Sequence, residues 1–366
     1  MKKPKLSLAL VVKNEEAMLE RCLESVKDVV DEIVVTDTGS TDKTVQIAKK
    51  YTDKVHYFEW IDDFSAAYNY CISKTSGNYI LKWDADFVLK PSSRKALLEL
   101  KESGFAGANH ISVILQNIEV DTGLPSSTAP RELIFKKIDF MYLSPVHMYL
   151  SPQKGVKKTS IIDRNIVVDH YKDLEVKEFR LSQSYQIIQK ALELDSDSAY
   201  LSYHMILGYM YSGEYVEALQ SIEKFLITWP DYLPERVLVV LQYRFECLLQ
   251  LGRVTETKGM LKGFSRFADF PQYMLLNADI AAVQKDDTSI ELYQKYLAVD
   301  FLPSDTEYGY FYYRNMAHPR IMLARLTAET HPELAVSYLH ELANYSSYFD
   351  SAKESEAVAK ELGLTL

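Results

Sequence analysis

Two aspartates separated by one residue, Asp84 and Asp86, are the side chains in this sequence best suited to chemistry. They follow a short apolar run, Tyr79–Trp83. Successive side chains of an extended chain point to opposite faces, so Asp84 and Asp86 point to the same side. One carboxylate of such a pair can bind Mg²⁺ or Mn²⁺ while the other accepts from a ribose hydroxyl, and the cation offsets the charge of a diphosphate. A chance pair is the alternative, because the chain contains 51 acidic residues.

The composition is that of an ordinary globular protein with two or three domains. The 366 residues are 47% hydrophobic and 25% charged, and a domain usually has about 150 residues. The net charge is −10 and no run of basic residues stands out, which argues against nucleic acid as a partner. An anionic substrate would therefore need a metal or helix N-termini beside it.

The cysteines and apolar segments predict a cytoplasmic protein that is not transmembrane. Cys22, Cys71 and Cys247 are far apart among apolar neighbours, so we expect reduced thiols in the core. The apolar run Leu6–Val12 is followed by charged residues and not by a small-residue cleavage site, so we interpret it as a strand. No segment approaches the roughly 18 apolar residues that span a bilayer, so membrane association would be peripheral, at the inner face.

Alternating strand and helix patterns in the first hundred residues predict an α/β domain with a parallel sheet and helices on both faces. Continuous apolar runs indicate buried strands over 6–12, 32–36, 55–58 and 79–83. Helical spacing predicts a helix over 15–30, which Asn14 would cap. Further strands are expected over 111–118 and 132–136. The segment 121–130 between them would be a mobile lid or an ordinary hairpin connection.

From about residue 176 the sequence has helical spacing and almost no strand pattern. One stretch matches a tetratricopeptide repeat, a helix-turn-helix unit of about 34 residues. Its characteristic residues are Tyr209, Gly213, Tyr215, Ala218, Ile222, Phe225 and Pro230. Less regular copies follow near 252–254, 289–297 and 331–343. We therefore predict an α/β domain over 1–175 and an all-α tetratricopeptide-like helical repeat domain over 176–366. The repeats would bind an acceptor protein or a second copy in a homodimer, or merely support the first domain.

Four motifs in this order resemble the family 2 glycosyltransferases of the GT-A fold. They are residues 11–16, 32–44, 60–65 and 84–86. The sequence is most similar to a bacterial branch that has a tetratricopeptide-like C-terminal half and glycosylates bacteriocin peptides on cysteine. The resemblance implies a Rossmann-like GT-A domain that binds a nucleotide sugar, with a UDP-sugar as donor and Mg²⁺ or Mn²⁺ as cofactor.

The resemblance also implies which residues bind the nucleotide. Val12, Asn14, Glu15 and Asp37 would line the base, and the Asp37 carboxylate would accept a hydrogen bond from the uracil N–H. Asp84 would contact the ribose or the metal.

Four further residues gain roles at the reacting end of the donor. Asp86 would ligate the metal that bridges the diphosphate, and His170 would complete the metal sphere. Arg131 would contact the acceptor or a phosphate, and His147 would lie near the reacting sugar. For each histidine the alternative is a partly buried imidazole whose hydrogen bonds are satisfied within the protein.

Three residues depart from the pattern of that branch. Phe87 stands where an acid follows the second aspartate, and Tyr68 stands where an arginine would pair with phosphate. Met148 follows His147 where the branch has a glutamate, the natural candidate for the general base. Either another acid such as Asp121 is the base, or the acceptor is a thiol, whose pKa of about 8.5 requires little help, or the domain no longer turns over.

We therefore predict a metal-dependent, inverting glycosyltransferase that moves a sugar from a UDP-sugar to a peptide or protein side chain. One alternative is a transferase that acts on a cell-envelope glycan or lipid intermediate, but the basic or amphipathic membrane-facing patch that it would need is not evident in the sequence. The other alternative is a catalytically weak subunit that binds or assembles a protein-glycosylation complex through its repeats.

Overall fold

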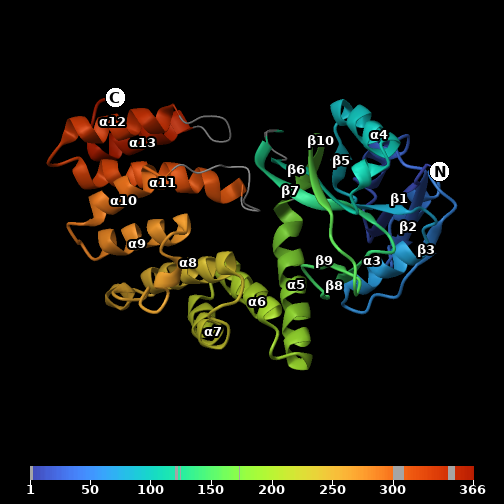
Figure 1. Ribbon diagram of the computed structural model, residues 1–366, viewed down its shortest axis with the longest axis horizontal. Coiled ribbons are helices and arrows are strands. Elements are labelled where there is room, and N and C mark those ends of the chain that lie inside the picture. The colour runs from blue at the N-terminus through green and yellow to red at the C-terminus, as the bar shows by residue number, and fades with distance from the viewer. Residues whose placement is uncertain (1–2, 120–122, 124, 173, 300–308, 345–350) are drawn as a thin grey trace. The chain divides into compact units, whose positions relative to one another are not determined.

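The computed structural model describes residues 3–119, 123, 125–172, 174–299, 309–344 and 351–366 (Figure 1). The chain divides into two compact units, Met1–Ile187 and Ile188–Leu366. The division falls inside the long helix α5 (Leu174–Leu194). The domain boundary expected between residues 175 and 176 lies near the start of that helix and stays a prediction.

The first unit is built on an eight-stranded sheet with the strand order β3-β2-β1-β4-β7-β6-β10-β5. Its strands are β1 (Leu6–Val12), β2 (Glu32–Asp37), β3 (Val55–Tyr57), β4 (Tyr79–Trp83), β5 (Phe87–Leu89), β6 (His110–Glu119), β7 (Pro125–Lys136) and β10 (Ser160–Lys172). Strands β1 to β4 are parallel, but β7 is antiparallel to both β4 and β6, and β5 is antiparallel to β10. The sheet is therefore mixed. The parallel sheet predicted from the first hundred residues is confirmed for β1 to β4, and β6 and β10 also pair in parallel.

Other elements cover both faces of this sheet. They are α1 (Leu19–Val26), α2 (Thr44–Ala48), α3 (Phe64–Ser73), α4 (Arg94–Glu102) and the hairpin of β8 (Phe140–Leu143) and β9 (Tyr149–Pro152). Strand β1 sends Leu8 and Leu10 into the cluster that contains α1 and α4, and sends Ala9 into the cluster that contains α3 and the hairpin. Both leucines are fully buried, and each contributes about 1.5–3 kcal/mol. Alternate side chains of β1 thus contribute to the hydrophobic core on both faces of the sheet.

The segment expected to be a loop over 121–130 is largely strand. From Pro125 to Pro130 it pairs with β6, with Pro125 opposite Ile118 and Pro130 opposite Ile114. Its serine and proline content is typical of loops, but strand formation depends more on the available pairing partner than on local propensity. Residues 121, 122 and 124 of this segment, Asp121 among them, lie outside the described residues.

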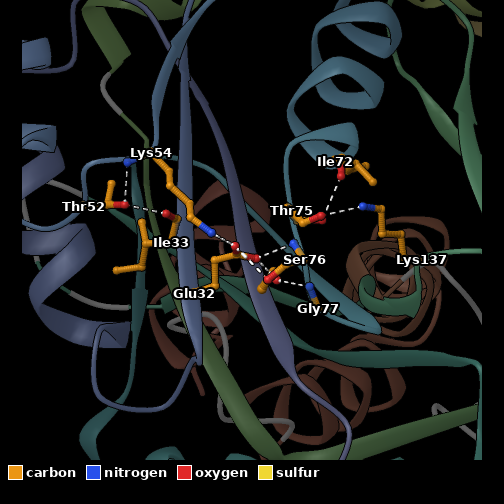
Figure 2. Close-up of polar contacts among 10 residues, drawn as sticks. Glu32, Ile33, Thr52, Lys54, Ile72, Thr75, Ser76, Gly77 and Lys137 are labelled. Atoms are coloured by element: carbon orange, nitrogen blue, oxygen red, sulfur yellow. Dashed lines mark hydrogen bonds and ion pairs between the residues drawn. The ribbon is translucent and has the colours of Figure 1, made fainter.

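At the amino-terminal edge of the sheet, Glu32 joins three chain segments (Figure 2). Its carboxylate accepts hydrogen bonds from the Ser7 hydroxyl and the Lys54 ammonium, and from the backbone N–H and the hydroxyl of Ser76 at 2.7 and 3.0 Å. The Ser7 oxygen also accepts from the N–H of Gly77 at 2.9 Å, and a Cβ at Gly77 would overlap that oxygen. Burial acts to raise the pKa of Glu32, but Lys54, Ser7 and Ser76 lower it to about 2.

The second unit is helical, and each helix packs against the next one along the chain. Its helices are α6 (Ala199–Ser212), α7 (Tyr215–Thr228), α8 (Pro234–Gln250), α9 (Pro271–Val283), α10 (Ser289–Leu297), α11 (Gly309–Thr327), α12 (Pro332–Ala343) and α13 (Ser351–Leu362). One buried cluster extends from α6 to α9 and another from α9 to α13. Sequential packing of this kind is the architecture of helical repeat arrays.

The stretch with the clearest tetratricopeptide pattern forms the hairpin of α6 and α7. Gly213 ends α6 with a φ of 74°, a conformation that glycine adopts without strain. Ala218, Ile222 and Phe225 of α7 are fully buried. The predicted fold class, an α/β domain followed by helical repeats, is confirmed.

The three cysteines are buried and free, as expected of core thiols. Among the residues that the structure describes, no helix combines the length and the apolar character needed to cross a bilayer.

Candidate active site

The carboxyl ends of β1, β2 and β4 meet at one edge of the sheet. Val12 pairs with Asp37, and Leu10 pairs with Trp83. Asp84 follows Trp83 directly, so it lies at the same edge as Asp37. Open α/β sheets bind ligands outside these strand ends.

Asn14 links the loops that follow β1 and β2. Its Oδ1 accepts from the N–H of Thr41 at 2.8 Å, and its own N–H donates to Ser40 Oγ at 2.9 Å. Its φ of 54° lies in the left-handed region, where asparagine is favoured over most residues. Asn14 therefore joins two loops and does not cap the first helix as predicted; α1 begins only at Leu19, without a side-chain cap.

Asp37 and Glu15 belong to the same linked loops. The Asp37 carboxylate accepts from the backbone N–H groups of Gly39 and Ser40 at 3.0 to 3.2 Å, and the residue is only 6% exposed. The N–H of Glu15 donates to Thr44 Oγ1 at 2.7 Å. Hydrogen bonds within the protein thus hold the loops that carry both of these predicted base-binding residues.

Asp84 is held by Tyr68 and Lys82. The Tyr68 hydroxyl donates to Asp84 Oδ1 and lies 2.8 Å from the carbonyl oxygen of Trp83. Lys82 forms an ion pair with Asp84 Oδ2. Burial acts to raise the pKa of Asp84, but Lys82, Tyr68 and His170 outweigh it and hold this pKa below its usual value. Burial, reinforced by the Asp84 charge, raises the pKa of Tyr68, which therefore acts as a neutral donor to an ionised carboxylate.

Asp86 and His170 form a second pair. His170 Nε2 lies 3.2 Å from Asp86 Oδ2, and His170 Nδ1 lies 2.9 Å from Asn117 Oδ1. An amide oxygen only accepts, so Nδ1 carries a hydrogen and Nε2 faces the Asp86 carboxylate. The N–H of Tyr171 also donates to the carbonyl oxygen of Asp86 at 3.0 Å. These contacts join the loop after β4 to the end of β10.

The Asp86–His170 pair fits a divalent cation. A carboxylate oxygen suits Mg²⁺ and Mn²⁺, and the imidazole nitrogen favours the softer Mn²⁺. The bond from Nδ1 to Asn117 is the kind of support that metal-ligating histidines usually have. In the described part of the chain no three His, Cys, Asp or Glu side chains gather into a cation-binding group, and both Asp84 oxygens already have protein partners. The predicted ligand set of Asp84, Asp86 and His170 therefore stays a prediction, in which Asp86 and His170 lie within 3.2 Å of each other.

A family model described as "Glycosyl transferase family 2" matches residues 7–164, which include this edge of the sheet. This part of the chain therefore resembles the family 2 glycosyltransferases. Among known proteins it is 49% identical over 81 residues to a TPR repeat-containing protein of Synechococcus elongatus, across 22% of this chain and 20% of that protein. It is 40% identical over 85 residues to the glycosyltransferase SunS of Bacillus subtilis, across 23% and 20%. With an uncharacterized glycosyltransferase of Rickettsia bellii it shares 33% identity over 127 residues, across 35% and 42%. The chain thus matches less than half the length of these relatives.

Two solved structures give weaker likenesses to this chain. Staphylococcus aureus TarS aligns with a TM-score of 0.37 at 16% identity, over 66% of this chain and 52% of TarS. Glucosyl-3-phosphoglycerate synthase from Mycobacterium tuberculosis, in complex with Mn²⁺, UDP-glucose and phosphoglyceric acid, aligns with a TM-score of 0.35 at 18% identity, over 52% and 79%. Both scores are below 0.5, so the fold assignment rests on the strand order and the family match.

Arg131 and His147 lie on other elements of the first unit. Arg131 is exposed on β7, and its Nη1 lies 3.3 Å from the carbonyl oxygen of Pro130. It precedes Ile134, which pairs with β4, by three residues. Because β7 runs antiparallel to β4, this places Arg131 towards the carboxyl end of β4. His147 is exposed in the loop between β8 and β9 and has a φ of 49°. The roles given to both residues stay predictions.

The three departures from the branch pattern have structural partners in the domain. Phe87 is buried, and its ring packs edge-on against His170 at 5.0 Å between centroids. Met148 packs against the buried cluster that includes Tyr68, and Tyr68 itself holds Asp84. In place of the expected charged side chains, Tyr68 therefore holds Asp84 and Phe87 packs against His170. Asp121, the alternative base, lies outside the described residues.

Two residues of the site were missed by sequence reasoning. Lys82 stands two positions before Asp84, so strand alternation alone places both on one face. Asn117 has no comparable signal, because it reaches His170 only through the pairing of β6 with β10, 53 positions away.

Proposed function

We propose that this chain is a metal-dependent glycosyltransferase that transfers a sugar from a UDP-sugar to a peptide or protein side chain, with inversion at the sugar carbon. The observation that carries the proposal is the Asp86–His170 pair beside Asp84. It lies at the sheet edge from which the linked loops after β1 and β2 start. The family match supports the reaction class. The resemblance to the bacteriocin-modifying branch supports a peptide acceptor.

The residues of the chain would bind the donor from one end to the other. Asp37 would accept from the uracil N–H. Asp84 would accept from a ribose hydroxyl, because each carboxylate oxygen has a second lone pair beyond the one used by Tyr68 or Lys82. Asp86 and His170 would hold the cation, which when bound supplies positive charge to the leaving diphosphate. Phe87, packed on the His170 ring, would keep that imidazole in position.

The acceptor would be held partly by the helical unit. Two acceptor chemistries fit the donor site. A cysteine thiol has a pKa of about 8.5 and needs little help from a base. A hydroxyl would require a base near the reacting carbon. A panel of peptides with Cys or Ser at one position separates these two cases.

Titration calorimetry with UDP, with and without Mn²⁺, tests the donor site first. We expect Mn²⁺ to tighten UDP binding by at least about tenfold, since the cation offsets the diphosphate charge next to the Asp84 and Asp86 carboxylates. A screen of UDP-sugars for slow Mn²⁺-dependent release of UDP would then identify the sugar. If UDP binding does not respond to Mn²⁺ or Mg²⁺, the metal-dependent site is wrong and the weakly catalytic assembly subunit becomes the better interpretation.

The Tyr68 hydroxyl provides a finer test of the same site. We expect Tyr68→Phe to weaken UDP binding about tenfold, because a hydrogen bond to a charged group contributes about 1.5–3 kcal/mol and its loss frees the Asp84 carboxylate to move. The ring itself is retained, so the unit should stay folded, although loss of the same bond should lower its melting temperature by several degrees. Tyr142→Phe is the matched control, since this buried ring lies 5.8 Å from Tyr68. Equal UDP affinity in the two variants would show that Tyr68 does not position Asp84.

A further inference from the structure

The helical unit contains a pocket of about 300 Å³ between α8, α9, α10 and α11. Its walls are mostly apolar and include Leu238, Phe245, Leu275 and Met322. This volume is at the lower end of small-ligand pockets, which begin at about 300 Å³. The pocket lies wholly within the second unit, so it is not part of the candidate active site.

A polar cluster lines one side of this pocket. The Asp279 side chain is only 8% exposed. Its Oδ1 accepts from the Tyr293 hydroxyl at 2.6 Å and lies 2.7 Å from His318 Nε2. Both bonds end on the same oxygen, and among the described residues Oδ2 receives no hydrogen bond. A carboxylate oxygen of a mostly buried residue that borders an apolar pocket is a strong acceptor for an incoming cation or donor.

The charge of the helical unit favours a cationic partner. Residues 188–366 contain 25 Asp and Glu and 15 Lys and Arg, which gives −10, the net charge of the whole chain. The first unit is therefore neutral overall. An acidic surface attracts basic segments over several ångströms before contact, and the pocket then offers both an apolar wall and a buried acid.

We propose that this pocket binds a lysine side chain of a partner polypeptide, with the ammonium on Asp279 Oδ2 and the methylene stem against the apolar walls. Long basic side chains commonly bury their stems in this way. Lysine fits better than arginine, because guanidinium recognition is usually bidentate and Oδ1 is already shared by Tyr293 and His318. The proposal concerns binding alone, so it stands or falls separately from the transfer reaction.

Binding of short capped peptides to the full chain tests the proposal. The probes are Ac-Ala-Ala-Lys-Ala-Ala-NH₂ and its counterparts with norleucine or arginine at the centre, measured in the absence of any nucleotide sugar. We expect the lysine peptide to bind about tenfold more tightly than the norleucine peptide, which has the same stem without the charge. The Met322 methyl group, which lines the pocket, should shift in an NMR titration with the lysine peptide only.

Two variants separate the pocket from general acidic attraction. Asp279→Asn keeps an acceptor for Tyr293 and His318 but loses the charge, so the preference for lysine should fall to about twofold or less. Asp287→Asn removes the same charge from an exposed position on the α9–α10 loop and should leave the preference unchanged. The proposal is overturned by equal binding of the lysine and norleucine peptides, by an unchanged preference in Asp279→Asn, or by a Met322 signal that does not move. Tighter binding of the arginine peptide would overturn the choice of lysine.

Discussion

Replacing Asp86 with asparagine is expected to remove Mn²⁺-dependent UDP binding and to lower sugar transfer by about a hundredfold or more. Asp86 is the carboxylate that faces His170 Nε2, and its side chain is only 17% exposed. Asparagine has nearly the same shape but no charge, so the cation would lose its anionic ligand. Calorimetry with UDP and Mn²⁺, followed by UDP release in the presence of the donor sugar, measures both effects.

The control for this variant is Asp53→Asn, which removes the same charge from an exposed residue between α2 and β3. It should leave UDP binding and transfer unchanged. Melting temperatures of both variants show whether the domain is intact. Full activity of Asp86→Asn in excess Mn²⁺ would mean that the cation, if one is used, is held elsewhere.

The strands nearest the site could be predicted because each is a short apolar run that ends in polar residues. Strands β1, β2 and β4 were expected within one residue of their observed bounds. Parallel pairing then brings Asp37 and Asp84 to one edge. Local hydrophobic pattern was sufficient here because buried parallel strands are apolar on both faces.

The second half of the sheet could not be predicted in the same way. Strand β7 begins at Pro125 inside a segment whose composition indicated a loop, and β5 and β10 were not expected at all. Strand β7 pairs with its neighbour β6 and with the distant β4, and β5 pairs with the distant β10. The register of these pairings depends on partners that a local pattern does not contain. The contact between Asn117 and His170 is a direct result of the pairing of β6 with β10, which explains why it was missed.

The roles of Tyr68 and Phe87 could not be predicted from their residue types alone, because they depend on the side chains around them in the fold. Tyr68 was interpreted as the loss of a phosphate-binding arginine, but its hydroxyl holds Asp84. Phe87 was interpreted as the loss of an acid, but its ring supports His170. Both substitutions replace a charge with a buried aromatic ring, and the energetic meaning of such a change depends on neighbours that only the fold brings together.

Replacing Glu32 with glutamine is expected to destabilise the first unit by about 2–3 kcal/mol at pH 7, far from any candidate site. The Glu32 side chain is 7% exposed and accepts from Ser7, Lys54 and Ser76 (Figure 2). Glutamine retains one acceptor oxygen but loses the charge, so Lys54 loses its ion pair and one donor is left without an acceptor. Chemical denaturation with Trp83 as the fluorescent reporter, in a background where Trp60 and Trp229 are phenylalanine, follows this unit alone, since the chain has three tryptophans.

The pH dependence of this difference identifies its cause. The pKa of Glu32 falls from 4.5 to about 2 on folding, so the carboxylate stabilises the folded state above pH 4.5, and this contribution is lost as the pH falls through 4.5 towards 2. The full contribution is about 3 kcal/mol, at about 1.4 kcal/mol for each pH unit between the two values. Wild type and Glu32→Gln should therefore differ most at pH 7 and progressively less at pH 4 and pH 3. Glu24→Gln, at an exposed carboxylate that pairs with Lys27, should change stability little at any pH. A difference between wild type and Glu32→Gln that stays constant with pH would assign the loss to packing, because packing does not titrate.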